Sequence, residues 1–329
     1  MQTLDLTSLV LLDNCRRRRL PGRTPANRTF PQKNDSVSIQ KITKCMSMSQ
    51  NLYLVTGASG YIGSAIVIEL LKNKENVVFG FDSKSFPEEL LKKNNPSGAF
   101  HDVIGDVLSE AALLDLREKL AAQQGDLHGI VNCFCAPEAP IKTKYSYQTD
   151  PEIDMPGEKR SLAIIDVLTN YANQDFLKEL EINLVGLHNV IRNLTPEILK
   201  SRNVSIVNFA STYGIKVPNQ DLFTNRKKFV CKLPGYSTSK AGVISYTEYM
   251  ASIFSGREAK NLVRFNCIAP GNLIRNHNEE FIKNYVRLTW NSRMPNIEDV
   301  ISGVMFLLSP SSSYINGTTL EIDSGLVRK

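Results

Sequence analysis

The chain has few of the residues that build metal sites or disulfide frameworks. Its four histidines are scattered, and they form no cluster with carboxylates. The six cysteines are not spaced like zinc ligands, so we expect no bound metal and reduced thiols in a cytoplasmic protein. They are Cys15, Cys45, Cys133, Cys135, Cys231 and Cys267. Cys133 and Cys135 fall at the end of an expected strand and are interpreted as packing residues.

Long apolar runs, internal repeats and low-complexity tracts are also missing. The segment 9–12 is too short to span a bilayer. The arginine run at 16–19 follows this segment, whereas the charges of a signal peptide precede its apolar part. We therefore expect no membrane partner.

The net charge of +6 comes from one end of the chain. Residues 1–50 carry nine Lys and Arg against three Asp, and the remainder carries 30 basic and 30 acidic residues. Nucleic-acid binding by the globular part therefore has no support. We predict a basic, disordered leader over residues 1–48, with Met46 or Met48 as a natural start. A transit peptide, or a contact of the arginine run with nucleic acid or an anionic membrane, stays open.

Residues 49–329 are predicted to form one α/β domain of the Rossmann type. Apolar strands alternate with helical periods, which indicates a doubly wound, mostly parallel sheet of seven strands. The length allows one large buried core. The strands are expected near 51–56, 76–81, 100–104, 128–133, 203–209, 261–267 and 317–322.

A glycine turn joins the first strand to a helix expected over 62–71. The turn reads Thr56-Gly57-Ala58-Ser59-Gly60-Tyr61-Ile62-Gly63. Glycines let the backbone approach a pyrophosphate, and the free N–H groups at the helix start attract its charge. The second strand ends in Asp82, about twenty residues beyond the glycines, where an acid bonds the ribose hydroxyls of NAD. A solvated strand-end residue is the alternative for Asp82.

Tyr236 and Lys240 stand four residues apart in Tyr-Ser-Thr-Ser-Lys. On a helix they share a face, so the ammonium would lie beside the phenol. A fixed cation within about 4–6 Å favours the phenolate and lowers its pKa from about 10, which suits acid–base chemistry near neutral pH. A surface lysine beside a half-buried tyrosine is the alternative if the spacing stood alone.

The order of these motifs resembles the short-chain dehydrogenase/reductase family over residues 51–326. Further segments match the family's pattern in sequence. They are Asp106-Val107 after the third strand, Asn132 at the end of the fourth, Asn183 on the following helix, Ser211 after the fifth strand, Pro270-Gly271 in the turn over the nicotinamide, and the last strand near 315–325.

The resemblance implies hydride transfer between nicotinamide C4 and a carbonyl or secondary alcohol carbon. Tyr236 would exchange the proton, Ser211 would bond the substrate oxygen, and Lys240 would hold the nicotinamide ribose. Asn183 would fix a water that relays protons to Lys240. The implied cofactor is NAD, with NADP as the alternative, and the implied assembly is a homodimer or homotetramer.

Several residues depart from the family's pattern. The spacing of Gly57, Gly60 and Gly63 belongs to the branch that modifies sugar nucleotides, whereas the rest of the chain follows the short branch. Cys133 and its neighbours replace an Asn-Ala-Gly motif. Arg275 stands where the family often has threonine, which removes a nicotinamide contact and places a cation near a phosphate.

Two long loops bear on the substrate, which we expect to be a small molecule. The intervals 132–183 and 211–236 are about twice the expected length, and both leave carboxyl ends of central strands. The second interval carries Lys216, Arg226, Lys227, Lys228 and Lys232, which suits a phosphorylated substrate or is simply a solvated loop.

More narrowly, residues 214–240 and the segments 281–285 and 298–309 resemble oxidoreductases of bacterial surface-polysaccharide and flagellin-modification pathways. This favours a sugar or nucleotide-sugar substrate. The alternatives are a 3-oxoacyl-carrier reductase, a non-redox dehydratase or epimerase with bound NAD, and a nucleotide-sensing protein without catalysis. The four residues Asn183, Ser211, Tyr236 and Lys240 argue against the last.

Overall fold

The computed structural model describes residues 50–94, 98–136, 147–148, 164–165, 167–222, 228–229, 232–255 and 262–329. All of them belong to one unit, Met48–Lys329. The leader expected over 1–48 and the basic residues Arg226 and Lys227 lie outside the described residues, so the predictions made for them stay predictions.

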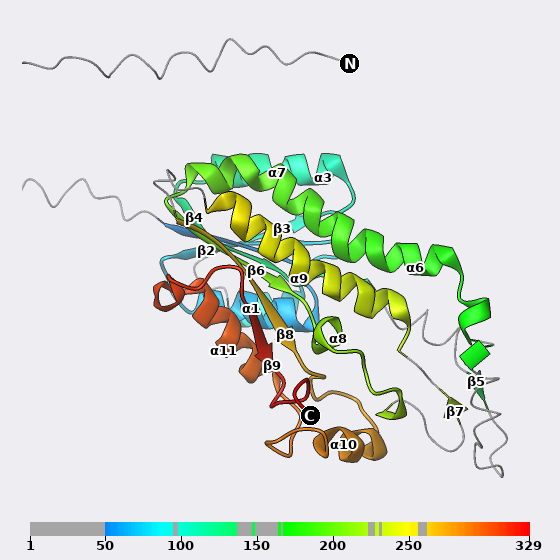
Figure 1. Ribbon diagram of the computed structural model, residues 1–329. Helices are drawn as coiled ribbons and strands as arrows, with labels where there is room; N and C mark the ends of the chain where they lie inside the picture. The colour runs from blue at the N-terminus through cyan, green and yellow to red at the C-terminus, as the bar shows by residue number, and fades with distance from the viewer. Residues whose placement is uncertain are drawn as a thin grey trace, which may run out of the picture. The chain divides into compact units, whose positions relative to one another are not determined.

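Seven parallel strands form the central sheet, in the order β3-β2-β1-β4-β6-β8-β9 (Figure 1). This confirms the predicted doubly wound α/β fold, and the strand ends differ from the predicted ones by a few residues. The strands are β1 (Asn51–Thr56), β2 (Asn76–Asp82), β3 (Phe100–Ile104), β4 (Asp126–Asn132), β6 (Asn203–Phe209), β8 (Leu262–Pro270) and β9 (Thr319–Ile322).

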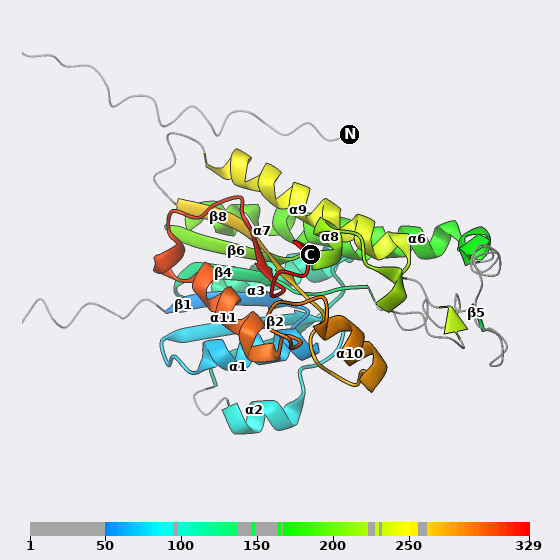
Figure 2. The same ribbon diagram turned by 60° about the horizontal axis from the view of Figure 1, so that its bottom comes forward.

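Helices cover both faces of the sheet, with α3, α7 and α9 on one face and α1 and α11 on the other (Figures 1 and 2). None of the helices in the described part of the chain has the length and apolar character that a bilayer span requires. The main helices are α1 (Tyr61–Leu71), α2 (Glu88–Asn94), α3 (Glu110–Ala122), α6 (Asn173–Leu180), α7 (Gly186–Lys200), α8 (Thr212–Ile215), α9 (Pro234–Phe254), α10 (Glu279–Val286) and α11 (Ile297–Leu308).

The two layers give the protein two cores, one on each face of the sheet. On one face, Phe265 and Leu113 are fully buried beneath α3, α7 and α9. On the other face, Ile66 and Val304 fill the space between the sheet and the pair α1 and α11. A parallel sheet that is covered on both faces needs apolar residues at successive positions, which explains the unbroken apolar run of β2.

The chain reverses its direction of travel across the sheet between β1 and β4. Strands β1 to β3 proceed to one edge, and the chain then returns to place β4 beside β1. At such a switch point the connections leave the carboxyl ends in opposite directions and open a crevice there. The glycine turn follows β1 at this crevice, and residues 133–136 follow β4.

The two long loops contact each other outside the main sheet. A short strand in the first loop, β5 (Tyr147–Gln148), pairs antiparallel with β7 (Lys228–Phe229) in the second. Figure 1 shows this pair beyond the ends of α6 and α9. The insertions therefore meet each other, and Lys228 of the basic loop lies in their shared ribbon.

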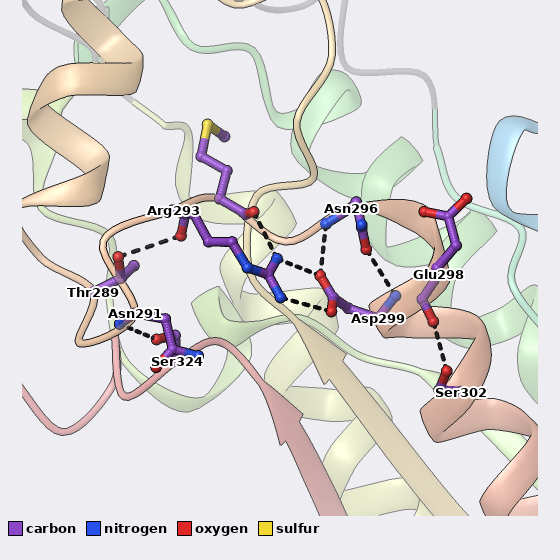
Figure 3. Close-up of polar contacts among 9 residues, drawn as sticks. Thr289, Asn291, Arg293, Asn296, Glu298, Asp299, Ser302 and Ser324 are labelled. Carbon is purple, nitrogen blue, oxygen red and sulfur yellow. Dashed lines mark hydrogen bonds and ion pairs between the residues drawn. The ribbon is translucent and has the colours of Figure 1, made fainter.

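A network of polar contacts holds the segment between α10 and α11 (Figure 3). Asn296 and Asp299 form a capping box at the start of α11, and each side chain accepts the other's backbone N–H. The guanidinium of Arg293 donates to both oxygens of Asp299, at 2.6 and 2.8 Å. These bonds from Arg293 lower the pKa of Asp299.

We predict that Asp299→Asn lowers the free energy of unfolding at pH 7 by at most about 1 kcal/mol, because the pair is largely exposed. The lowered pKa means that the ionised carboxylate stabilises the fold above its unfolded pKa of about 3.9, and that this contribution is lost as the pH falls through the folded value. Urea titrations of both proteins between pH 7 and pH 3 should therefore converge. Glu298→Gln, the control, should show a smaller effect at pH 7, and an undiminished gap at pH 3 would contradict the assignment.

Candidate active site

The glycine turn is packed so tightly that two of its positions exclude a side chain. Gly57 has φ +73°, and a Cβ there would lie 2.5 Å from the backbone nitrogen of Phe134. A Cβ on Gly63 would overlap the carbonyl of Gly57. Gly60 differs, because the nearest atom to its Cβ position is 3.3 Å away. The two outer glycines therefore close the turn, and Gly60 leaves space on its exposed side.

Helix α1 begins at this turn without a side-chain cap. Gly60 is the N-cap residue and has an extended backbone, and the first intrahelical bond runs from the Ser64 N–H to its carbonyl. The N–H groups of Tyr61, Ile62 and Gly63 precede that bond. Together with the positive end of the helix dipole, such groups form an anion-binding position.

A cavity of about 420 Å³ opens at this helix start. It contains the predicted cofactor positions on the glycine turn, Asp82 and the Asp106-Val107 pair, and it adds residues from three further segments. The wall is formed by Gly57, Gly60, Tyr61, Ile62, Gly63, Phe81, Asp82, Ser83, Gly105, Asp106, Val107, Cys133, Phe134, Cys135, Ile182, Leu273 and Arg275.

Asp82 connects the second strand to the glycine turn. Its carboxylate accepts the backbone N–H of Ser59 at 3.0 Å and that of Lys84 at 3.2 Å. The Ser59 hydroxyl in turn donates to the carbonyl of Lys84 at 2.8 Å. Ser59 is therefore bonded to Asp82 and is not among the residues that line the cavity. The carboxylate is held in place at one end of the cavity.

Lys240 and Tyr236 lie side by side on α9, as their spacing predicts. The Lys240 ammonium is 5.9 Å from the centroid of the Tyr236 ring and donates to the carbonyl of Phe209 at 2.8 Å. The lysine is 3% exposed, and Tyr236 is half-buried. The bond to Phe209 anchors α9 against the carboxyl end of β6.

Ser211 lies two residues beyond that anchor, at the N-cap of α8. Its hydroxyl accepts the N–H of Tyr213 at 3.2 Å. Helix α8 packs backbone to backbone on α9, because a Cβ on Gly214 would lie 2.6 Å from the carbonyl carbon of Lys240. The short helix thus brings Ser211 to the part of α9 that carries the tyrosine and lysine.

Asn183 lies in a π-helical turn, Glu181–Val185, between α6 and α7. The sequence predicts only a helix here, and such single turns occur often at functional sites. The side-chain oxygen of Asn183 accepts the N–H of Ala136 at 2.8 Å, and its amide donates to the hydroxyl of Ser239 at 2.9 Å. Asn183 therefore ties the segment after β4 to α9, one residue before Lys240.

The side chain of Asn132 does not take the cofactor position that the sequence predicts. It lies inside the sheet, where it accepts from Thr56 at 2.9 Å and donates to Asn208 at 2.8 Å. Asn208 then donates to Thr247 on α9 at 2.9 Å. These partners satisfy the buried amide, and the following residue, Cys133, forms the cavity wall instead.

Pro270 and Gly271 also lie off the cavity wall. The Gly271 N–H donates to the carbonyl of Ile322 at 3.0 Å, and a Cβ on this glycine would overlap the hydroxyl of Tyr285. The wall is reached further on, at Leu273 and Arg275. The turn after β8 therefore positions later residues rather than lining the cavity itself.

The two cysteines at the end of β4 differ in surroundings. Cys133 donates to the carbonyl of Thr56 at 3.0 Å, and burial, assisted by the negative charge of Asp82, raises the pKa of its thiol to about 12. This agrees with the packing role predicted for it. Cys135 is exposed and lies on the cavity wall, so for this residue the packing prediction is wrong.

Two cations near the site were not singled out as site residues by the sequence. The ammonium of Lys232 lies 4.0 Å from the centroid of the Tyr236 ring and 5.8 Å from that of Tyr213. The guanidinium of Arg275 lies 4.4 Å from the centroid of the Tyr61 ring. The sequence does draw attention to both residues, because Lys232 belongs to the basic loop and Arg275 replaces an expected threonine. The sequence does not reveal which aromatic ring each cation contacts.

A second cavity, of about 320 Å³, lies beside α8. Thr212, Tyr213 and Lys216 line it on one side, and Leu326 and Lys329 of the C-terminal segment line it on the other. Its wall is mostly apolar with lysines among the lining residues. Because Thr212 follows Ser211 directly, this cavity adjoins the same end of β6.

Comparison with known families divides the chain in two. The model described as enoyl-(acyl carrier protein) reductase matches residues 160–327, just over half of the chain. The model of the NAD dependent epimerase/dehydratase family matches residues 53–149. The second match covers the glycine turn, whose spacing is typical of that branch.

Individual relatives match most of the chain as single proteins. The chain is 28% identical to a 3-oxoacyl-(acyl-carrier-protein) reductase of Thermotoga maritima over 86% of this chain and 100% of that protein. It is 24% identical to the reductase of the same name from Synechocystis, over 85% of this chain and 98% of the relative.

The crystal structure of a short chain dehydrogenase from Leptospira borgpetersenii with bound NAD+ is 25% identical, with a TM-score of 0.63, and covers 92% of this chain and 100% of that one. The seven-stranded sheet, the glycine turn, the tyrosine and lysine on α9 and the family match over residues 160–327 lead to one assignment. The chain belongs to the short-chain dehydrogenase/reductase family.

Proposed function

We propose that this protein is an NAD-dependent oxidoreductase that acts on a carbonyl or secondary alcohol. The observation that carries the proposal is the placement of Lys240 beside Tyr236 on α9, anchored to the end of β6 and next to Ser211. When bound, the nicotinamide supplies the hydride chemistry. The residues of the chain bind, orient and move a proton.

The cavity at the glycine turn fits a dinucleotide. Gly60 is the N-cap residue of α1 and carries no side chain beside the uncapped N–H groups, which would leave room for a pyrophosphate there. Asp82 would accept hydrogen bonds from ribose hydroxyls, and Asp106 and Val107 would contribute the adenine side. The bound NAD+ of the Leptospira relative supports the choice of NAD.

In the proposed mechanism the Tyr236 hydroxyl exchanges a proton with the substrate oxygen. The Lys240 ammonium favours the phenolate form electrostatically, and its bond to Phe209 fixes the cation in place. The Ser211 hydroxyl donates a hydrogen bond to the same substrate oxygen. Asn183 acts as a positioning residue through Ser239, and the water relay expected of it stays part of the proposal.

We propose further that the substrate carries a negative charge. Lys232 lies over the Tyr236 ring, and its backbone is held by the Gln220 side chain, which accepts the Lys232 N–H at 2.8 Å. The apolar second cavity with Lys216 and Lys329 suits the rest of such a molecule. Phosphorylated substrates, either nucleotide-sugars or acyl groups on a phosphopantetheine carrier, meet both requirements.

Different observations favour the two kinds of substrate. The resemblance of residues 214–240 to polysaccharide-modifying and flagellin-modifying oxidoreductases favours a sugar. The Thermotoga and Synechocystis relatives, named as 3-oxoacyl reductases, favour the acyl carrier. The third candidate, a non-redox epimerase or dehydratase with bound NAD, is favoured by the family match over residues 53–149 and disfavoured by Ser211.

A homodimer or homotetramer remains part of the proposal. Large apolar side chains are exposed on the outer faces of two neighbouring helices, namely Leu199 on α7 and Tyr249 and Ile253 on α9. Exposed apolar side chains mark contacts between proteins where they gather into one surface. Burying these faces against another copy would also stiffen the helix that carries the tyrosine.

We predict that Tyr236→Phe lowers turnover by about 10²- to 10⁴-fold and leaves NAD affinity unchanged, because only the exchangeable proton is removed. Oxidation of NADH should be measured against a panel of keto-sugars and 3-oxoacyl thioesters, with NAD binding measured by calorimetry. Tyr249→Phe on the same helix serves as the control and should remain active. Full activity of Tyr236→Phe would exclude the proposed role.

Cofactor choice gives a second prediction. The Asp82 carboxylate should repel the additional phosphate of NADP, so NADH should bind more tightly than NADPH. Asp82→Ser should reduce this preference, whereas Glu75→Gln, in the exposed turn before β2, should not. Titration of each protein with both reduced cofactors measures the ratio, and tighter NADPH binding by the unaltered protein would refute the role of Asp82.

The charge at Lys232 gives a third prediction. Lys232→Gln should raise KM for a phosphorylated substrate more than for its neutral analogue, and the difference should shrink as salt screens the attraction. Lys74→Gln, in the turn at the opposite end of the sheet, is the control. Equal changes in KM for the charged and neutral compounds would show that Lys232 does not bind the charged group of the substrate.

A further inference from the structure

Arg275 lines the cavity at the glycine turn, although it comes from a distant part of the sequence. It lies in the segment after β8 and forms part of the same wall as Gly60 and Tyr61. Its side chain is exposed, and no ion pair of Arg275 is found among the described residues. Within the described part of the chain, a cation therefore stands at the rim of the cavity without an ion-paired carboxylate.

The backbone around Arg275 is firmly anchored. Before it, the Asn272 N–H donates to the hydroxyl of Tyr285 at 2.9 Å, and the Ile274 N–H donates to the carbonyl of Pro295 at 2.9 Å. Pro295 directly precedes the capping box of α11, where Figure 3 shows Asn296 bonded to Asp299. The backbone that leads to Arg275 is thus held by α10 and by the residue before the N-cap of α11. The fold therefore sets the position of Arg275 at the cavity.

The guanidinium rests on the ring of Tyr61, with 4.4 Å between the guanidinium carbon and the ring centroid. Tyr61 is the first residue of α1, so the stack holds a cation beside the positive end of the helix dipole. The guanidinium and the positive end of the α1 dipole repel each other. An anion bound between them would be attracted by both and would offset this repulsion.

We infer that Arg275 binds the diphosphate of the dinucleotide, opposite the N–H groups of α1, with Tyr61 as the shelf that orients it. This inference rests on the proposed function, which places a dinucleotide in the cavity. The planar fork of arginine bonds two phosphate oxygens at once, and stacking on an aromatic ring orients that fork in advance. Asp82 and Arg275 would then mark the ribose and diphosphate ends.

The test uses isothermal titration of the full chain with NAD+, ADP, AMP and adenosine. Arg275→Gln should weaken ADP and NAD+ by about ten- to a hundredfold, the range of a lost charge-assisted pair. AMP should lose less, and adenosine should bind as to the unaltered protein. Arg275→Lys should be intermediate, because it keeps the charge but not the fork.

Two further variants separate this role from a general charge effect. Arg287→Gln removes an equal charge just after α10, away from the cavity wall, and should leave all four affinities unchanged. Tyr61→Leu removes the aromatic shelf while keeping the backbone N–H, and should weaken ADP by a few-fold. In the double variant with Arg275→Gln this loss should disappear, because the shelf acts only through the arginine. Equal melting temperatures without ligand exclude misfolding.

The outcomes are distinct. Unchanged ADP and NAD+ binding by Arg275→Gln, with normal binding by the unaltered protein, would overturn this inference and leave the proposed function standing. A loss seen only with NADPH, titrated into Arg275→Gln as in the test of Asp82, would assign Arg275 to the additional phosphate of NADP and would also overturn it. Failure of the unaltered protein to bind either NAD+ or ADP would overturn the proposed function and this inference together.

Discussion

A row of buried hydrogen bonds across the carboxyl ends of the central strands holds both halves of the site. Thr56 on β1, Asn132 on β4, Asn208 on β6 and Thr247 on α9 are joined side chain to side chain at 2.8 to 2.9 Å. All four side chains are almost fully buried. Removing one of them would leave a neighbouring polar group without a hydrogen bond, which would lower the free energy of unfolding by about 1–3 kcal/mol. The row therefore locks three strands and α9 in register, so the glycine turn cannot shift relative to the helix that carries the tyrosine and lysine.

The glycine spacing, which departs from the rest of the family pattern, has a structural reason in this chain. Gly63 packs directly on the carbonyl of Gly57, so helix α1 begins immediately after the turn and its first N–H groups face the cavity. The remaining segments follow the short-branch pattern. In this pattern α8 and α9 pack at the carboxyl end of β6, and β8 follows α9 and pairs with β6. The two halves meet along the β4–β6 pair and in both helical layers, and the buried row joins them at the carboxyl ends of the strands.

The proposed chemistry and the proposed cofactor contacts use charges held in different ways. Lys240 is buried and fixed by a carbonyl, which suits a cation that must stay beside one phenol through a reaction. Lys232 and Arg275 instead rest on aromatic rings nearer to solvent, where the proposed function uses them to attract an anion. In the proposed function, the fixed charge serves proton transfer and the exposed charges serve binding.

The sequence by itself determined the α/β sheet, the glycine turn, Asp82, and the pairing of Tyr236 with Lys240. These features follow from local rules, namely apolar runs of strand length, glycine spacing and the four-residue period of a helix. The tertiary structure decided which polar group faces which partner. Asn132 turned into the sheet because Thr56 and Asn208 satisfy it there, and Arg275 reached Tyr61 although more than two hundred residues separate them. Such contacts depend on how distant strand ends meet, and no local pattern carries that information.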